Sequence, residues 1–312
     1  VSFGVAISVG PVLAGYVGVE GIFWLTALLS LVAIFVIIYI VPDPIQSKVH
    51  RDAELIPGQI KHVLNNAELL RLNYGIFILH LILTASFIVI PLLMRDAGLG
   101  GSQHGQVYLP VFIVSLLTAV PFIILAEKKR KMKPVFIAAI AVIVVSELGL
   151  QYFHQSLPGL VVFLWVFFCG FNLLEATLPS LVSKTAPGDM KGTAMGFYST
   201  AQFLGAFLGG ALGGWSYGEF GGSAVFIMSA VAGASWLVVS FTMKPPRYLA
   251  NMLISISNLS RVQAEQLTEE VLKVTGVEEV KLHFGEGVVY LKVDNQLLDK
   301  DRLQYSITQF AS

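Results

Sequence analysis

Residues 9–18 read VGPVLAGYVG and residues 209–218 read GGALGGWSYG, so one glycine-rich pattern occurs twice in this chain. When residues 10–16 are aligned with residues 209–215, an aromatic residue, Tyr16 or Trp215, ends each copy, and Gly10, Pro11, Ala14 and Gly15 fall on Gly209, Gly210, Gly213 and Gly214. A short turn with one glutamate and another apolar segment come after each copy. Such self-similarity indicates a repeated architecture. The alternative is a chance match between two segments rich in glycine and alanine.

The composition is that of a protein embedded in lipid. Hydrophobic residues make up 55% of the chain, charged residues only 13%, and the mean hydropathy is +0.74. A water-soluble domain carries roughly 25% charged residues. The single cysteine, Cys169, lies in an apolar run, which excludes disulfides within the chain and cysteine metal sites and favours a small buried side chain. We therefore expect a membrane protein without a metal or a cofactor.

Apolar runs of about 20 residues predict transmembrane helices. The first candidate is incomplete and the other seven are full length. The eight candidate spans are Val1–Val17, Ile22–Val41, Tyr74–Met94, Val107–Ala126, Val135–Phe153, Leu157–Val182, Thr193–Trp215 and Ser223–Met243.

The connections between these spans alternate in charge. Counted over the loops, thirteen Lys and Arg residues lie on one side, and Arg95 alone lies on the other. By the positive-inside rule, the basic side faces the cytoplasm, and the chain ends there. The first span then runs outward.

The two copies of the pattern place the first span opposite the seventh, six spans later. Six-span repeats build one large class of transporters from two parallel halves. We therefore expect the first span to be the fifth of a first half, with four preceding helices of the same protein missing from this chain.

These features resemble the major facilitator superfamily, and within it the drug–proton antiporters. The pattern in the first span is similar to the second half of the antiporter signature of the fifth helix, and AEKKRKMKP at 126–134 is similar to a degenerate copy of the acidic–basic loop motif. A tail after the last span narrows the resemblance to YajR-type transporters of the bacterial inner membrane. The positions that carry the motifs are Gly10, Pro11, Ala14, Gly15, Glu127 and Arg130.

The resemblance implies an all-α polytopic membrane protein with the major facilitator fold, helices 5–12, plus a small α+β ferredoxin-like domain. The domains expected are 1–41 (end of the first half), 42–73 (cytoplasmic linker), 74–244 (second half) and 245–312 (cytoplasmic ferredoxin-like domain). In the linker, Ile60, Val63, Leu64 and Ala67 have the spacing of one face of an interfacial helix. A plain linker is the alternative.

Ionisable groups at bilayer depth cost about 3 kcal/mol on insertion scales and therefore suggest a function. His80 lies about 10 Å and Glu175 about 14 Å from the cytoplasmic ends of their helices, at about 1.5 Å per residue. If the helices adjoin, the two side chains meet and can exchange a proton near neutral pH. A static hydrogen-bonded pair that joins two helices is the alternative. Glu147 lies on a helix that is expected to be peripheral. Its carboxylate either is paired locally, faces water or has a function in transport.

Polar and aromatic side chains at helical spacing from this pair predict a substrate cavity for a moderately apolar small molecule, either neutral or cationic. Packing or lipid contact is the alternative for the aromatic residues. The cavity candidates are Thr84, Phe87, Phe168, Asn172, Tyr198 and Gln202.

Glycines repeated every four residues allow a second helix to approach closely. The resemblance implies that these helices pack between the two halves and control opening, and Pro11 is expected to kink its helix. Glu127 and Arg130 are expected mainly to mark topology, with gating as the lesser alternative. The packing candidates are Gly10, Pro11, Gly15, Gly205, Gly209 and Gly213.

After residue 245 the pattern changes to β-α-β-β-α, with a hairpin turn at Gly285–Gly287. This order is ferredoxin-like, with the last strand absent or short. The domain resembles heavy-metal-associated domains but lacks their cysteine pair, and its strands lack the aromatic and basic residues of RNA-binding sheets. With metal and RNA binding excluded, the remaining interpretation is that this domain is a regulatory or stabilising module.

Together these observations predict a proton-coupled secondary transporter that exports drugs or other small molecules by antiport, and not an enzyme. Its expected partners are membrane lipid, protons and a small-molecule substrate, without nucleic acid. A proton-coupled importer is one alternative. A membrane-anchored sensor with a regulatory tail is another.

Overall fold

In the computed structural model, the described residues are 2–42, 60–187, 190–245, 248–255, 259–283 and 288–311. They divide into two compact units. The first unit comprises Val1–Ser47, Gly75–Thr177 and Gln202–Thr242, and the second comprises Lys48–Tyr74, Leu178–Ala201 and Met243–Ser312.

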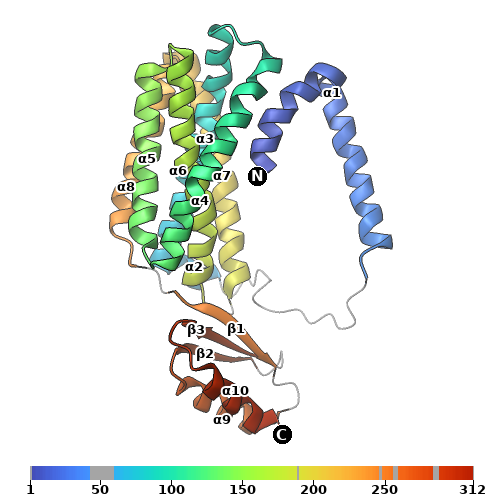
Figure 1. Ribbon diagram of the computed structural model, residues 1–312, viewed down its shortest axis with the longest axis vertical. Coiled ribbons are helices and arrows are strands. Elements are labelled where there is room, and N and C mark those ends of the chain that lie inside the picture. Colours follow the sequence, from blue (N-terminus) through green and yellow to red (C-terminus); the bar gives the residue numbers. More distant parts are fainter. Residues whose placement is uncertain are drawn as a thin grey trace. The chain divides into compact units, whose positions relative to one another are not determined.

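Long helices make up the first unit, and α3 to α8 run side by side in it (Figure 1). Their bounds are α1 Ser2–Tyr39, α3 Ala67–Asp96, α4 His104–Lys128, α5 Met132–Phe153, α6 Leu157–Thr185, α7 Lys191–Phe220 and α8 Gly222–Phe241, with the short 3-10 helix η2 at Gly101–Gln103. Several of these helices continue into the second unit. The core of the first unit is apolar, and its largest fully buried side chains include Trp236, Phe136 and Phe226.

Among the described residues, six helices are long and apolar enough to cross a membrane. The eight predicted spans correspond to seven helices, because α1 contains the first two. The seventh predicted span is α7, which is 30 residues long but is not one of the six. Its many glycines lengthen the helix but add little to its mean hydropathy.

Helix α1 is broken between the two predicted spans. Gly18 has a φ of 72° and a ψ of 171°, which glycine adopts without steric penalty. The break in helical φ/ψ lies at Gly18, and Figure 1 shows α1 as two helical arms joined at a sharp bend; the kink at Pro11 stays a prediction.

The predicted interfacial helix is short. Residues 43–59 of the linker lie outside the described residues, and helix α2 covers only Ile60–Leu64. Asn66 accepts hydrogen bonds from the backbone N–H groups of Glu68 and Leu69, at 3.1 and 3.3 Å. This N-cap starts α3 at Ala67, so Ala67 belongs to α3 and not to the interfacial helix.

The C-terminal part of the second unit forms a three-stranded antiparallel sheet with two helices. Its elements are β1 Ala250–Ser255, α9 Arg261–Leu272, β2 Val277–His283, β3 Val288–Val293 and α10 Lys300–Ala311. The strand order is β1-β3-β2. The predicted element order is confirmed, while the predicted turn at Gly285–Gly287 lies outside the described residues.

The sheet and its helices share a small apolar core that includes Val289, Leu291 and Leu267. Ser260 caps α9 in a capping box with Gln263, whose backbone N–H donates to the Ser260 hydroxyl. Gly276, with a φ of 89°, turns the chain into β2. A Cβ atom there would lie 2.5 Å from the backbone of Leu298, which excludes any larger residue without a shift.

Candidate functional site

Three helices of the first unit bring His80, Glu175 and Gln202 together. His80 comes from α3, Glu175 from α6 and Gln202 from α7. The Nε2 atom of His80 lies 2.8 Å from Nε2 of Gln202 and 3.9 Å from Oε2 of Glu175. His80 and Glu175, which the sequence predicts to lie at similar depths in the membrane, are therefore neighbours, and Gln202 contacts the same imidazole nitrogen.

The hydrogen bonds assign the protons on the His80 ring. Its Nδ1 atom lies 3.3 Å from the carbonyl oxygen of Ile76, which can only accept, so Nδ1 carries the hydrogen. The amide N–H of Gln202 then donates to Nε2. In this arrangement the imidazole is neutral and its Nε2 lone pair faces a donor.

Glu175 is placed to donate a hydrogen bond to Nε2 of His80 when the carboxyl group is protonated, and to accept one when Nε2 carries a proton. Its Oε2 atom is buried and has no hydrogen-bond partner among the described residues, although 38% of the side chain is exposed. The His80 side chain is only 11% exposed. A shift of about 1 Å closes the 3.9 Å separation to hydrogen-bond distance. Of the two side chains, Glu175 is therefore the more exposed, and it is the one whose Oε2 atom lacks a hydrogen-bond partner among the described residues.

Aromatic rings line the α3, α4 and α6 side of this group. Phe171 lies 6.0 Å from the His80 ring between centroids, and Phe168 lies 5.8 Å from Phe87 and 5.7 Å from Phe112. Phe168 is fully buried, whereas Phe87 is half-buried. Of the two predicted cavity aromatics, Phe168 therefore lies inside an aromatic cluster and Phe87 at its edge.

Two predicted cavity residues use their polar groups to join helices. Asn172 donates its amide to the hydroxyl of Ser115 on α4, at 3.0 Å. The hydroxyl of Thr84 lies 2.8 Å from the carbonyl of His80 and 2.9 Å from the carbonyl of Ala206 on α7. Ser115 has no motif around it in the sequence. The one signal in the sequence is that Ser115 is a polar residue inside an apolar helix.

The glycines of α7 face α3 at close range. A Cβ atom at Gly205 would lie 2.1 Å from the carbonyl of Phe77, and one at Gly209 would lie 2.2 Å from the hydroxyl of Thr84. At Gly213 it would lie 2.7 Å from Cα of Ala85. The spacing of four residues therefore builds a contact between α7 and α3, both of which belong to the second predicted half.

The other predicted packing and loop residues lie apart from this contact. A Cβ at Gly10 or Gly15 would meet no atom within 4 Å among the described residues. Tyr198 is buried on α7, one turn before Gln202. Glu127 lies exposed in the last turn of α4 and Arg130 in the exposed turn that follows, where the Arg130 N–H donates to the Glu127 carbonyl at 3.3 Å and Arg130 has a φ of 52°.

Glu147 forms a second polar contact inside the bundle. It is fully buried on α5, and its two carboxyl oxygens lie 3.0 and 3.2 Å from the hydroxyl of Ser86 on α3. It is therefore a locally paired group, one of the alternatives that the sequence left open. Among the described residues, no group of three His, Cys, Asp or Glu side chains is placed to hold a metal ion.

Comparison with known proteins agrees with this architecture. The sequence model of the Major Facilitator Superfamily matches residues 1–210 and 133–255. The chain is 39% identical over 310 residues to the inner membrane transport protein YajR of Escherichia coli K12, covering 99% of the chain and 68% of YajR. It is 32% identical over 212 residues to the uncharacterized transporter BU466 of Buchnera aphidicola, covering 67% of the chain and 54% of that protein.

A more distant similarity covers about half of the chain. The multidrug resistance protein MdtH of Aeromonas salmonicida is 27% identical over 150 residues, which is 48% of the chain and 35% of MdtH. The family model alone covers more than half of the chain. The chain is a mostly helical transporter that belongs to the Major Facilitator Superfamily.

Proposed function

We propose that the protein is a proton-coupled secondary transporter that exports small molecules by antiport with alternating access. The observation that carries the proposal is the group formed by His80, Glu175 and Gln202 on three helices. A transporter driven by a proton gradient needs a group that binds a proton in one state and releases it in another. The arrangement on α3, α6 and α7 supports that role.

The proposed coupling step is a proton transfer within this group. When Glu175 takes up a proton, its negative charge is lost and no ion pair with His80 forms. When Glu175 is ionised, a proton on Nε2 of His80 is stabilised by the carboxylate 3.9 Å away, and the Gln202 amide must turn its oxygen toward the ring. The protonation state thereby changes the contacts that hold α3, α6 and α7 together.

The proposed substrate is a moderately apolar molecule, with or without a positive charge. An ionised Glu175 attracts a cation, and the nearby rings of Phe171 and Phe87 offer apolar and cation–π surface. Competition between the proton and a cationic substrate for one carboxylate would give antiport. The name of MdtH, a multidrug resistance protein, supports a drug-like substrate. A proton-coupled importer is the second candidate, because the same pair serves either direction.

We place the protein in a bacterial inner membrane as a multi-pass protein, as the name of YajR suggests. The proposed domains are 1–41 and 74–244 as parts of the two transporter halves, 42–73 as the linker and 245–312 as a cytoplasmic domain. The basic loops support the cytoplasmic side for this last domain.

The C-terminal domain is proposed to stabilise or regulate the transporter by contact with α6. Within the second unit, Lys292 of β3 is only 5% exposed and donates to the carbonyl oxygens of Lys184, at 3.3 Å, and of Ala186. A cation at the last carbonyls of a helix stabilises that helix end. Because α6 also carries Glu175, this contact supports a regulatory connection rather than an independent sensor.

The proposal is tested by flux in proteoliposomes that contain the full-length protein. A panel of cationic and neutral drugs is tested with an imposed pH gradient, in the unsubstituted protein and in Glu175→Gln. We expect uphill movement of at least one substrate, lost in Glu175→Gln and retained in the control Glu219→Gln, whose carboxylate is exposed at the end of α7. Gradient-driven movement that survives Glu175→Gln would refute the proposed role of the pair.

A further inference from the structure

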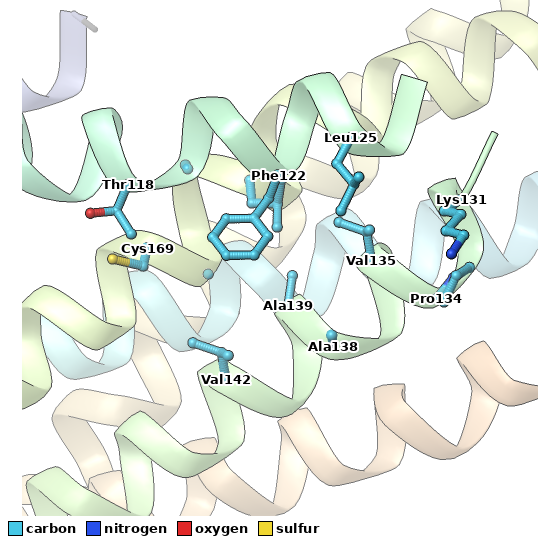
Figure 2. Close-up of a pocket in the computed structure, with 13 residues that line it drawn as sticks. Thr118, Phe122, Leu125, Lys131, Pro134, Val135, Ala138, Ala139, Val142 and Cys169 are labelled. Atoms are coloured by element: carbon cyan, nitrogen blue, oxygen red, sulfur yellow. The ribbon is translucent and has the colours of Figure 1, made fainter. Parts of the chain in front are cut away.

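A cavity of about 340 Å³ opens between α4, α5 and α6, and it includes none of the residues of the His80 group. Figure 2 shows Lys131 and Pro134 at one end and Thr118, Cys169 and Val142 at the other. Ligand pockets have volumes of this order or larger. Apart from Lys131, Thr118 and Cys169, every lining residue is apolar.

Small residues leave this space open. Gly170 of α6 approaches α5 so closely that a Cβ atom there would lie 3.0 Å from the carbonyl of Ala139. On the α4 side, the hydrogen bond from Asn172 to Ser115 holds α6 against α4. Ala119 and Ala139 are buried and form the floor, where larger side chains would fill the gap.

The rim of the cavity lies on the outer, apolar face of the bundle. Phe122 at the rim is 50% exposed, and Leu117 and Val145 nearby on α4 and α5 are also exposed. In helices that cross a membrane, such a face is in contact with acyl chains. An apolar cavity that opens on this face is therefore accessible to a lipid tail.

The positive charge at the Lys131 end of the cavity indicates that the lipid has an anionic headgroup. Five of the six residues from 128 to 133 are Lys or Arg, and Glu127 is the one acidic neighbour in the same turn. Lys128, Lys129 and Lys131 are exposed. Basic clusters at the membrane surface attract anionic headgroups. From Pro134 to Val142 the cavity follows α5 for about 12 Å, at about 1.5 Å per residue, so a tail fits below a headgroup held at Lys131.

We propose that this cavity is a binding site for an anionic phospholipid, with one acyl chain between α4, α5 and α6 and the headgroup at Lys131. A zwitterionic phospholipid has the same phosphate, but its cationic headgroup is repelled by the basic residues 128–133, so it binds more weakly. The site is independent of the proposed proton coupling, because it shares no residue with the His80 group.

The test is photo-crosslinking in nanodiscs of neutral phosphatidylcholine. The protein receives a small fraction of either phosphatidylglycerol or phosphatidylcholine that carries a diazirine on one acyl chain. Labelled residues are mapped by mass spectrometry. We expect the phosphatidylglycerol probe to label the α4 and α5 lining at least fivefold more than the phosphatidylcholine probe.

Two variants and two matched controls separate the tail contact from the headgroup contact. Ala138→Phe fills the cavity from its exposed rim and should lower labelling at least fivefold, whereas Val145→Phe, on the same helix outside the cavity, should not. Lys131→Gln should remove the preference for the anionic probe, whereas Lys61→Gln, an exposed lysine on α2, should keep it.

Cys169 provides a second readout, because it is the single cysteine of the chain and lines the cavity. Its alkylation by N-ethylmaleimide should slow when phosphatidylglycerol is added, and the slowing should be lost in Lys131→Gln. Equal labelling by the two probes overturns the proposal. So does a result in which Ala138→Phe behaves like Val145→Phe.

Discussion

The contact between α7 and α3 leads to a prediction whose size follows from the structure. At Gly209 an added Cβ would lie 2.2 Å from the Thr84 hydroxyl and 2.3 Å from the Leu81 carbonyl, whereas ordinary contacts begin at 3.4 Å. Gly209→Ala therefore forces the two helices apart by about 1 Å or breaks the hydrogen bond from Thr84 to Ala206. Overpacking of this kind typically costs about 1–3 kcal/mol.

The adjacent glycine is a matched control for this substitution. A Cβ at Gly210 would meet no atom within 4 Å, so Gly210→Ala adds a methyl group in open space. Because alanine is the better helix former, Gly210→Ala should be neutral or stabilise by up to about 1 kcal/mol. Gly213→Ala, with its nearest atom at 2.7 Å, should fall between the two.

The assay is reversible unfolding in mixed micelles, with increasing SDS and with helicity as the signal. We expect a midpoint that is lowered by Gly209→Ala, lowered less by Gly213→Ala, and unchanged or raised by Gly210→Ala. If Gly209→Ala and Gly210→Ala unfold at the same midpoint, α7 does not pack on α3 through this face.

Three further substitutions test other contacts. Gly276→Ala should destabilise the C-terminal domain by at least about 2 kcal/mol, because alanine disfavours a φ of 89° and its Cβ meets the backbone of Leu298; hydrogen exchange of β3 in the intact protein measures this. Lys292→Met removes a charged donor worth about 1.5–3 kcal/mol, so amide exchange at the end of α6 should rise about tenfold or more. Ser86→Ala leaves the buried Glu147 carboxyl without its hydroxyl donor, which should lower the SDS midpoint by the equivalent of about 1–3 kcal/mol.

Controls for these three are substitutions at less demanding positions, of the same type for the lysine and the serine. Lys273→Met removes an exposed lysine, and Ser146→Ala removes a hydroxyl that only bonds a carbonyl of its own helix. Leu272→Ala trims an exposed side chain of α9. An unchanged exchange rate in Lys292→Met, or equal midpoints for the two serine variants, would contradict the corresponding contact.

Much of the membrane architecture could be predicted because lipid imposes a simple rule on composition. Apolar runs gave the helices, and the depth of His80 and Glu175 gave two side chains that lie 3.9 Å apart. The period of four in α7 predicted a close helix contact. The four-residue repeat of glycines does not indicate which helix packs against α7. In the structure this helix is α3.

Residues that act through local or paired geometry leave little signal in the sequence. Asn66 starts α3 because its side chain reaches two backbone N–H groups, a cap that hydropathy does not reveal. Ser115 and Ser86 are ordinary residues of apolar helices until Asn172 and Glu147 are placed opposite them. The bend at Gly18 requires a positive φ, which many glycines in the segment permit equally.

Proton coupling through Glu175 can be examined by separating exchange from uphill transport. Proteoliposomes loaded with unlabelled substrate are diluted into labelled substrate without a gradient, and uphill transport is measured in parallel under an imposed pH gradient. We predict that Glu175→Gln keeps the exchange of a neutral substrate, because such a substrate does not need the carboxylate and the neutral carrier still alternates, and that it loses the uphill transport. Equal uphill transport in Glu175→Gln and the unsubstituted protein would contradict it.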